Sequence, residues 1–438
     1  MAVENVDAPP TVDHKPHAAF FRQSGWLMIA NIVGGMMTLG VHPLNKLIPD
    51  KEYTAFGALL MVVSCLPTIP LQMVFAQQSA LTLATGRERQ LASMIRRAWL
   101  GTFLVWVAGA SVVLVFRGAI VTRWQLPGTA GLLVTLPLLL VSFWVPMFSG
   151  VLQGRQDFFW MGWSAMLGGM SRLGIAALLV VALGWGAAGM MTGTLCGITL
   201  AALIAVWRTR DLWTLPAARF DGAGLLRQML PLVFGFGACQ FMFTSDTLFA
   251  KAFFTPEAMK PYVAAGTLSR GLLWLVMPLA AVMFPKIVHA NAKSEKSNLF
   301  GLVVLGTAVL GLLGMASLWL VGPLLVKILY KSGDLAGTMA LIPWYAGAMV
   351  PLALANVMVN DLLARARFQV VPLMVLLAIG YGFALPAMLG RFPNHPEVAL
   401  QTLGAFNLLL FLVCAWFAWG AKEKTGSDKI PAADRPGP

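Results

Sequence analysis

Long apolar stretches alternate with short polar connections along all 438 residues of the chain. A helix that crosses a bilayer needs about 20 mostly apolar residues, and twelve stretches reach that length. We expect spanning helices at residues 21–45, 54–82, 98–116, 129–152, 160–182, 187–207, 229–254, 261–286, 299–328, 340–363, 370–390 and 399–420. The connections between them are too short to hold a soluble domain. The pattern therefore predicts an all-α polytopic membrane protein.

The composition supports a membrane protein, and this class of protein gives the net charge a different interpretation. Hydrophobic residues make up 58% of the chain and charged residues only 11%, against about 25% charged residues in soluble domains. The net charge of +13 would suggest a nucleic-acid partner in a soluble protein. In a membrane protein it indicates sidedness, because lysine and arginine concentrate in cytoplasmic loops. We therefore expect no nucleic-acid partner.

The basic residues also predict an orientation. With the N-terminus inside, twenty of the 31 lysine and arginine residues are cytoplasmic, eight are outside and three lie within the membrane. Both termini are then cytoplasmic. The N-terminal tail lacks the basic and apolar regions of a cleaved signal peptide.

Two parts of the chain repeat each other. The run Tyr53–Leu59 matches Tyr262–Leu268 in the pattern YxAxGxL, 209 residues apart, and Phe75 and Phe284 keep that spacing. The run Leu152–Phe158 resembles Leu362–Phe368 at a spacing of 210. These matches, in register with the helix count, indicate a duplication of six helices.

The duplication predicts two pseudo-symmetric lobes around a central cavity. Six is an even number, so both lobes have one orientation and their twofold axis follows the membrane normal. The expected parts are a cytoplasmic tail (1–20), a six-helix lobe (21–207), a cytoplasmic linker (208–228), a second six-helix lobe (229–420) and a disordered cytoplasmic tail (421–438).

Two charges in the second lobe fall at one depth. Asp246 lies roughly 12 Å below the outer end of its helix and Arg270 roughly 13 Å below the start of the next. An aspartate or arginine at the bilayer centre costs roughly 2.5–3.5 kcal/mol on insertion scales, so such groups face a partner or a cavity. Three interpretations stay open: a structural ion pair, a pair that releases Arg270 to an anionic ligand, or Asp246 as a cation or proton site.

Two further cations are candidates for binding a substrate. Lys251 lies nearer the outer surface and is either a cavity cation or a side chain that snorkels to the interface. Arg172 lies near the middle of its helix, and no expected spanning helix of the first lobe carries an acid. We therefore expect Arg172 to line the cavity. With Asp246, the four charges favour a phosphate or carboxylate ligand, which arginine binds through paired N–H groups.

Signals for other chemistries are missing from the sequence. There is no Walker-type phosphate loop and no nucleophile elbow. The five histidines show no metal-ligand spacing. The four cysteines all fall inside apolar stretches, so disulfides and zinc sites are not expected. We expect a protein that is not an enzyme and that uses no cofactor or metal.

The chain resembles the polysaccharide and lipid-linked oligosaccharide flippases of the multidrug/oligosaccharidyl-lipid/polysaccharide (MOP) exporter superfamily. The twelve helices in two lobes, the run GVLQGRQDF at Gly150–Phe158 and the segment Asp246–Arg270 carry the resemblance. It implies a V-shaped, MATE-like fold with alternating access. It also implies that Arg172, Lys251 and Arg270 are cavity cations that bind the substrate, with Asp246 as charge partner or coupling residue.

The implied function is transfer of a polyprenyl-diphosphate-linked oligosaccharide from the cytoplasmic to the outer leaflet of a bacterial inner membrane. The partners would be the lipid-linked glycan and membrane lipids, with a polysaccharide polymerase and glycosyltransferases as candidates. Two departures narrow the branch. The two extra helices of lipid II flippases are absent, and the first lobe lacks the carboxylate of proton-coupled multidrug exporters.

Three rival classes remain. An ion-coupled multidrug or metabolite exporter of the same superfamily would need Asp246 and tolerate loss of Arg172. A major-facilitator carrier is disfavoured because GRERQ, at Gly86–Gln90, stands where its acidic-basic signature is expected. A membrane glycosyltransferase is disfavoured by the short outer loops.

Overall fold

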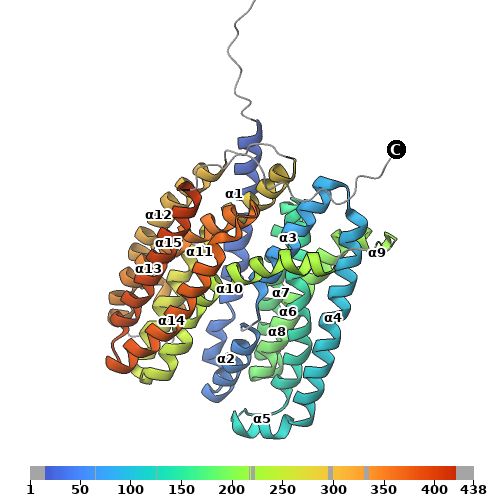
Figure 1. Ribbon diagram of the computed structural model, residues 1–438. Coiled ribbons are helices and arrows are strands. Elements are labelled where there is room, and N and C mark those ends of the chain that lie inside the picture. The colour runs from blue at the N-terminus through green and yellow to red at the C-terminus, as the bar shows by residue number, and fades with distance from the viewer. Residues whose placement is uncertain are drawn as a thin grey trace, which may run out of the picture. The chain divides into compact units, whose positions relative to one another are not determined.

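The computed structural model describes residues 15–64, 66–124, 126–216, 218, 222–293, 299–329 and 335–420. Throughout these residues the regular structure is helical, and the predicted all-α fold is confirmed (Figure 1). The elements are α1 (Lys15–Leu39), η1 (His42–Leu47), α2 (Asp50–Ser64), α3 (Thr68–Thr85), α4 (Glu88–Val115), α5 (Arg117–Arg123), α6 (Ala130–Gly154), α7 (Phe158–Leu183), α8 (Gly186–Arg208), α9 (Asp211–Thr214), α10 (Gly222–Phe253), α11 (Pro256–Ala292), α12 (Leu299–Leu329), α13 (Leu335–Ala364), η2 (Phe368–Val370), α14 (Val371–Arg391) and α15 (Pro396–Trp419).

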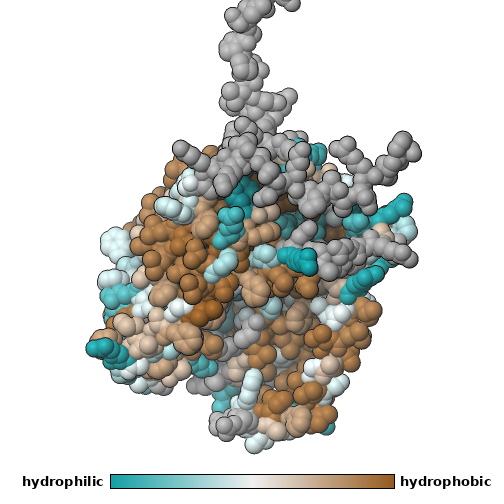
Figure 2. Space-filling view, viewed as in Figure 1, coloured by the Kyte–Doolittle hydropathy of each residue, from teal (hydrophilic) through white to brown (hydrophobic). Residues whose placement is uncertain are grey.

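Twelve segments of the described chain are long and apolar enough to cross a membrane, as the hydrophobic pattern predicts. Hydrophobic residues cover much of the surface (Figure 2). On α12, for example, Leu313 and Leu320 are more than half exposed. Apolar side chains on the outside of a helix bundle are expected where the surrounding solvent is lipid.

The chain divides into two compact units. Unit 1 comprises residues 1–65 and 95–215, and unit 2 comprises residues 66–94 and 216–438. Helix α3 packs against α10 and α11, and this contact groups it with unit 2. The six-helix lobes at 21–207 and 229–420 stay a prediction. Residues 15–20 of the expected N-terminal tail form the start of α1, and the C-terminal tail lies outside the described residues.

The second expected helix, 54–82, is divided in the structure into α2 and α3. Pro67 stands at the N-cap of α3 with φ −77° and ψ 62°. A proline has no N–H to donate, and it drives the preceding residue out of the helical region. The apolar run continues through Pro67, which is why periodicity alone predicted one helix.

The repeated motif has the same backbone in both copies. Gln156 after α6 and Ala366 after α13 both adopt a left-handed conformation, with φ 59° and 56°. One residue later, the amides of Asp157 and Arg367 each donate to a carbonyl five residues earlier, at 2.9 Å in both copies. A left-handed residue closing a helix in this way is a common C-terminal cap. The shared turn supports a duplication.

Glycines bring the helices of unit 1 into close contact. A Cβ added at Gly197 of α8 would lie 2.5 Å from the Gly168 carbonyl oxygen and 2.7 Å from Arg172 Cβ, both on α7. A Cβ at Gly169 of α7 would lie 2.5 Å from the Gly34 carbonyl oxygen on α1. Small residues allow membrane helices to approach closely and gain van der Waals contact. Helix α7, which carries Arg172, is therefore fixed between two neighbours.

We predict that Gly197→Ala destabilises the protein, because the new methyl group meets backbone atoms of α7. Overpacking of this kind costs about 1–3 kcal/mol. Gly174→Ala on α7 is the matched control, since a Cβ there would meet nothing within 4 Å. Thermal unfolding in detergent should show a lower midpoint for Gly197→Ala alone. Equal midpoints for the two variants would contradict the close packing.

Candidate functional site

A fully buried carboxylate lies at the centre of unit 2. Asp246 on α10 has no exposed surface, and its Oδ1 accepts a hydrogen bond from Arg270 Nη2 on α11 at 2.5 Å. Its Oδ2 accepts from the hydroxyl of Tyr262 on α11 at 2.9 Å and from the hydroxyl of Tyr345 on α13. Two helices, α11 and α13, thus donate to a carboxylate carried by a third. A buried charge is tolerated when it is paired and hydrogen-bonded in this way.

The Arg270 side chain is itself well satisfied. Its Nη2 also donates to Thr247 Oγ1 at 2.7 Å, and its Nε donates to the Phe243 carbonyl at 3.2 Å. The guanidinium lies 5.7 Å from the centre of the Phe243 ring and 5.4 Å from that of Tyr345. In this state Arg270 is engaged by groups of its own unit.

The expected pairing of Asp246 with Arg270 is confirmed, whereas the tyrosines were missed. The sequence contains only five tyrosines, and three of them, Tyr262, Tyr345 and Tyr381, come from separate helices to surround Asp246. A phenol hydroxyl within an apolar helix needs a polar partner. That rarity is the signal in the sequence that could have identified these residues.

The structure places Lys251 away from this cluster. It lies in the last turn of α10 and is exposed. Among the described residues it forms no ion pair. An exposed lysine at the end of a spanning helix fits the snorkelling interpretation. Its role in substrate binding stays a prediction.

Arg172 on α7 is a half-buried cation of unit 1. Its Nε is buried and has no hydrogen-bond partner in the described part of the chain, where it also forms no ion pair. His42 lies close enough for the two charges to interact, and His42 Nδ1 is 2.7 Å from the Tyr53 hydroxyl. An imidazole is neutral or cationic, so His42 cannot compensate the arginine charge.

A second buried acid was overlooked in the sequence. Asp361 lies inside the expected span 340–363 and is only 4% exposed. Arg365, one turn later on α13, donates to it from Nε at 2.9 and 3.1 Å. Asp246 is therefore not the only acid within the expected spans. Asp361 is paired within its own helix and adds no free charge.

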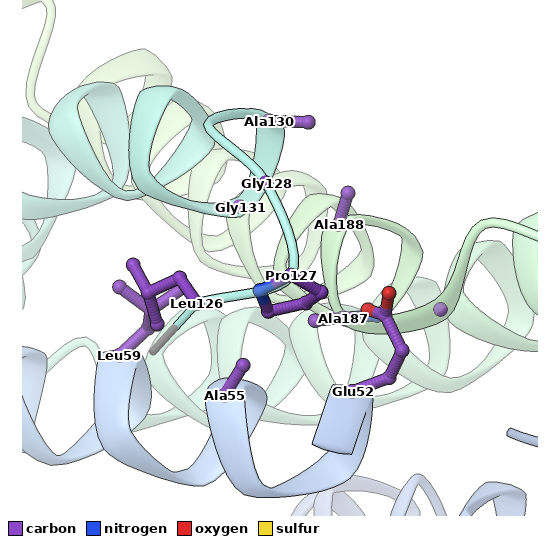
Figure 3. A pocket seen from close by; sticks show the side chains of 11 residues that line it. Glu52, Ala55, Leu59, Leu126, Pro127, Gly128, Ala130, Gly131, Ala187 and Ala188 are labelled. Atoms are coloured by element: carbon purple, nitrogen blue, oxygen red, sulfur yellow. The ribbon is translucent and has the colours of Figure 1, made fainter. Parts of the chain in front are cut away.

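A pocket of about 200 Å³ opens in unit 1 between α2, residues 126–131 and the start of α8 (Figure 3). Glu52 is the acidic residue of its lining, and Glu52 Oε2 accepts a hydrogen bond from the Ala187 amide at 2.8 Å. A carboxylate at a helix N-terminus satisfies a free amide and interacts favourably with the helix dipole. Glu52 is thus a cap for α8.

The described residues contain no candidate metal site. No group of three histidine, cysteine, aspartate or glutamate side chains lies close enough there to hold an ion. The arrangement can instead do two things: hold a buried carboxylate with ionisable neighbours in unit 2, and offer an uncompensated guanidinium in unit 1.

Removing the charge of Asp246 alone should be more harmful than removing both charges of the pair. Breaking a buried pair from one side costs about 3–5 kcal/mol, because the remaining charge is left uncompensated. We predict that Asp246→Asn lowers the unfolding midpoint strongly and that Asp246→Asn with Arg270→Gln recovers part of it. A double variant less stable than Asp246→Asn would contradict this.

Gly266 on α11 leaves the space that the Tyr345 ring occupies. A Cβ there would lie 2.9 Å from the ring and hydroxyl of Tyr345. We predict that Gly266→Ala displaces Tyr345 from Asp246 and costs about 1–3 kcal/mol of stability. Gly57, its counterpart in the repeat, would meet nothing within 4 Å. Gly57→Ala should therefore unfold at the wild-type temperature, and an equal loss in both variants would refute the role of Gly266.

No family model and no curated protein matches the chain. Solved structures match it along almost its whole length. A MATE structure in complex with MaD5 has a TM-score of 0.76 at 13% identity, covering 92% of this chain and 95% of that chain. A Vibrio cholerae MATE transporter has a TM-score of 0.69 at 13% identity, covering 93% and 98%. A MOP superfamily transporter from Pyrococcus furiosus, described with a binding pocket of reverse polarity that suggests a different function, has 0.72 at 12%, covering 92% and 95%. The chain has the fold of these MATE and MOP transporters.

Proposed function

We propose that this protein is a multi-pass membrane exporter of the MOP superfamily that works by alternating access. Its substrate would be a polyprenyl-diphosphate-linked oligosaccharide, moved from the cytoplasmic to the outer leaflet of a bacterial inner membrane. The shared fold and the twelve apolar segments support the exporter class. A transporter of this kind makes and breaks no covalent bond, so we propose that the protein is not an enzyme.

The observation that carries the substrate class is the uncompensated guanidinium of Arg172. Its Nε is buried without a hydrogen-bond partner in the described chain. An unpaired arginine within a membrane-spanning helix is costly, so we infer that an anionic ligand completes the site during transport. A diphosphate fits, because its oxygens accept paired N–H groups and its charge is compact. His42 is a neighbour that can help to orient it.

We assign Arg270 and Lys251 secondary places in this scheme. Arg270 would bind the substrate only after release from Asp246, to which it is bonded at 2.5 Å. Lys251, exposed at the outer end of α10, would interact with the anionic headgroup as it leaves toward the outer leaflet. Polysaccharide polymerase and glycosyltransferases would be the functional partners.

A second candidate, an ion-coupled multidrug or metabolite exporter, is favoured by a different observation. Asp246 is buried and receives two phenol hydroxyls in addition to Arg270. A buried carboxylate that exchanges a proton or cation can couple transport to an ion gradient. In that scheme Asp246 is essential, and Arg172 is a structural residue.

The test is flipping in proteoliposomes. A fluorescent polyprenyl-diphosphate glycan in the inner leaflet becomes accessible to an impermeant quencher only after transfer. We predict that Arg172→Ala reduces the transfer rate at least tenfold, because the anion loses its charged partner, and that Arg172→Lys retains part of it. Arg117→Ala, an exposed arginine of unit 1, is the control and should transfer at the wild-type rate.

The same vesicles separate the two candidates. A proton gradient should drive efflux of a cationic dye if the exporter interpretation holds, with loss in Asp246→Asn and none in Arg172→Ala. Dye efflux with that pattern, together with normal glycan transfer by Arg172→Ala, would overturn the flippase proposal.

A further inference from the structure

At one end of α7 and α8, arginine and tryptophan side chains alternate on the surface. The Arg208 guanidinium lies 5.6 Å from the centre of the Trp160 ring and 5.8 Å from that of Trp207. The Arg210 guanidinium lies 5.5 Å from the centre of the Trp207 ring. The two indole rings meet edge to face at 5.1 Å. We refer to Trp160, Trp207, Arg208 and Arg210 as the arginine–tryptophan patch.

The patch lies where two apolar segments end. The candidate spans Phe158–Leu183 and Gly186–Arg208 begin and end beside it. Tryptophan is enriched at the membrane–water boundary, where its ring lies at the level of the lipid headgroups. The distribution of lysine and arginine predicts that this end lies on the cytoplasmic side.

The charges of the patch leave one cation available. Arg208 is occupied by Asp157, whose Oδ2 accepts from Nε at 3.0 Å and from Nη2 at 2.8 Å. The acid next to Arg210, Asp211, is occupied by Arg155 at 2.6 and 2.9 Å, and that bonding lowers the pKa of its carboxyl. Arg210 is exposed and forms no ion pair among the described residues. Its guanidinium is oriented by an aromatic ring and not by a carboxylate.

An apolar surface runs from the patch toward the membrane interior. Trp207 is 47% exposed, and Leu203, one turn earlier on the same face of α8, is 60% exposed. Phe159 on α7 is 54% exposed. A cation at the boundary followed by an indole and an exposed leucine matches the order of groups in a phospholipid: phosphate, glycerol ester and acyl chain.

We propose that the arginine–tryptophan patch binds an anionic phospholipid of the cytoplasmic leaflet, with the phosphate on Arg210 and an acyl chain along Leu203. Arg208, fixed by Asp157, contributes further donors to the phosphate. The single excess cation favours a lipid with one net negative charge. Juxtamembrane arginines are attracted to anionic lipid surfaces by about 1 kcal/mol each. This site does not depend on the transported substrate.

Native mass spectrometry of the full-length protein in detergent tests the proposal. The protein is mixed with phosphatidylglycerol and phosphatidylcholine of identical acyl chains, and bound adducts are counted. The wild type should prefer phosphatidylglycerol. Arg210→Ala should lower that preference about fivefold, the equivalent of one basic residue at the surface. Arg210→Lys, which keeps the charge, should keep most of it.

Arg391→Ala is the matched control. Arg391 is also exposed at the end of a span and lies 6.0 Å from an aromatic ring, that of Phe392. Its loss should leave the lipid preference unchanged; an equal effect would indicate a general charge effect and overturn the site. Equal preference in Arg210→Ala and wild type would also overturn it. Excess glycerol phosphate should not displace the lipid, and displacement would show a site for soluble phosphate instead.

Discussion

The cost of an ionised group away from water governs where charge is found in this protein. Asp246 is fully buried in unit 2, where α10 carries the carboxylate and α11 and α13 provide its donors. Arg270 neutralises the charge, and two phenols take the remaining lone pairs. Since a broken buried pair costs more than an intact one contributes, this contact makes the three helices depend on one another. Gly266 contributes to the same network, because the absence of a side chain there leaves room for the Tyr345 ring.

The candidate cation of unit 1, Arg172, is not paired in this way among the described residues. Arg172 is held on a helix that glycines fix between α1 and α8, yet no carboxylate of the described chain pairs with it. The repeat makes the contrast instructive. Arg270 aligns with Met61 and Asp246 with Met37, so the ion pair of unit 2 has no counterpart in unit 1. The closing turns at Gln156 and Ala366 kept the same backbone. The two copies of the repeat thus share this turn and differ in charge.

The hydrophobic pattern predicted the features that depend on local composition, such as the spanning helices. It did not predict most contacts between side chains on different helices. The twelve segments and the pairing of Asp246 with Arg270 followed from apolar run length and helical depth. The break at Pro67 was missed because hydropathy does not register a lost amide. The tyrosines around Asp246 were missed because they come from helices that are distant in the sequence. The approach of His42 to Arg172 depends on how η1 packs on α7, which no local pattern encodes.

The most direct measurement is binding of a short-chain polyprenyl diphosphate to purified protein, followed by thermal unfolding at increasing ligand concentration. A ligand that binds only the folded state raises the unfolding midpoint as its concentration rises. The diphosphate should stabilise the wild type, and the gain should weaken with salt as expected for an ionic contact. It should be lost in Arg172→Gln, which keeps much of the side-chain volume and removes the charge. Equal stabilisation of both proteins would contradict the assignment of Arg172 as the anion site.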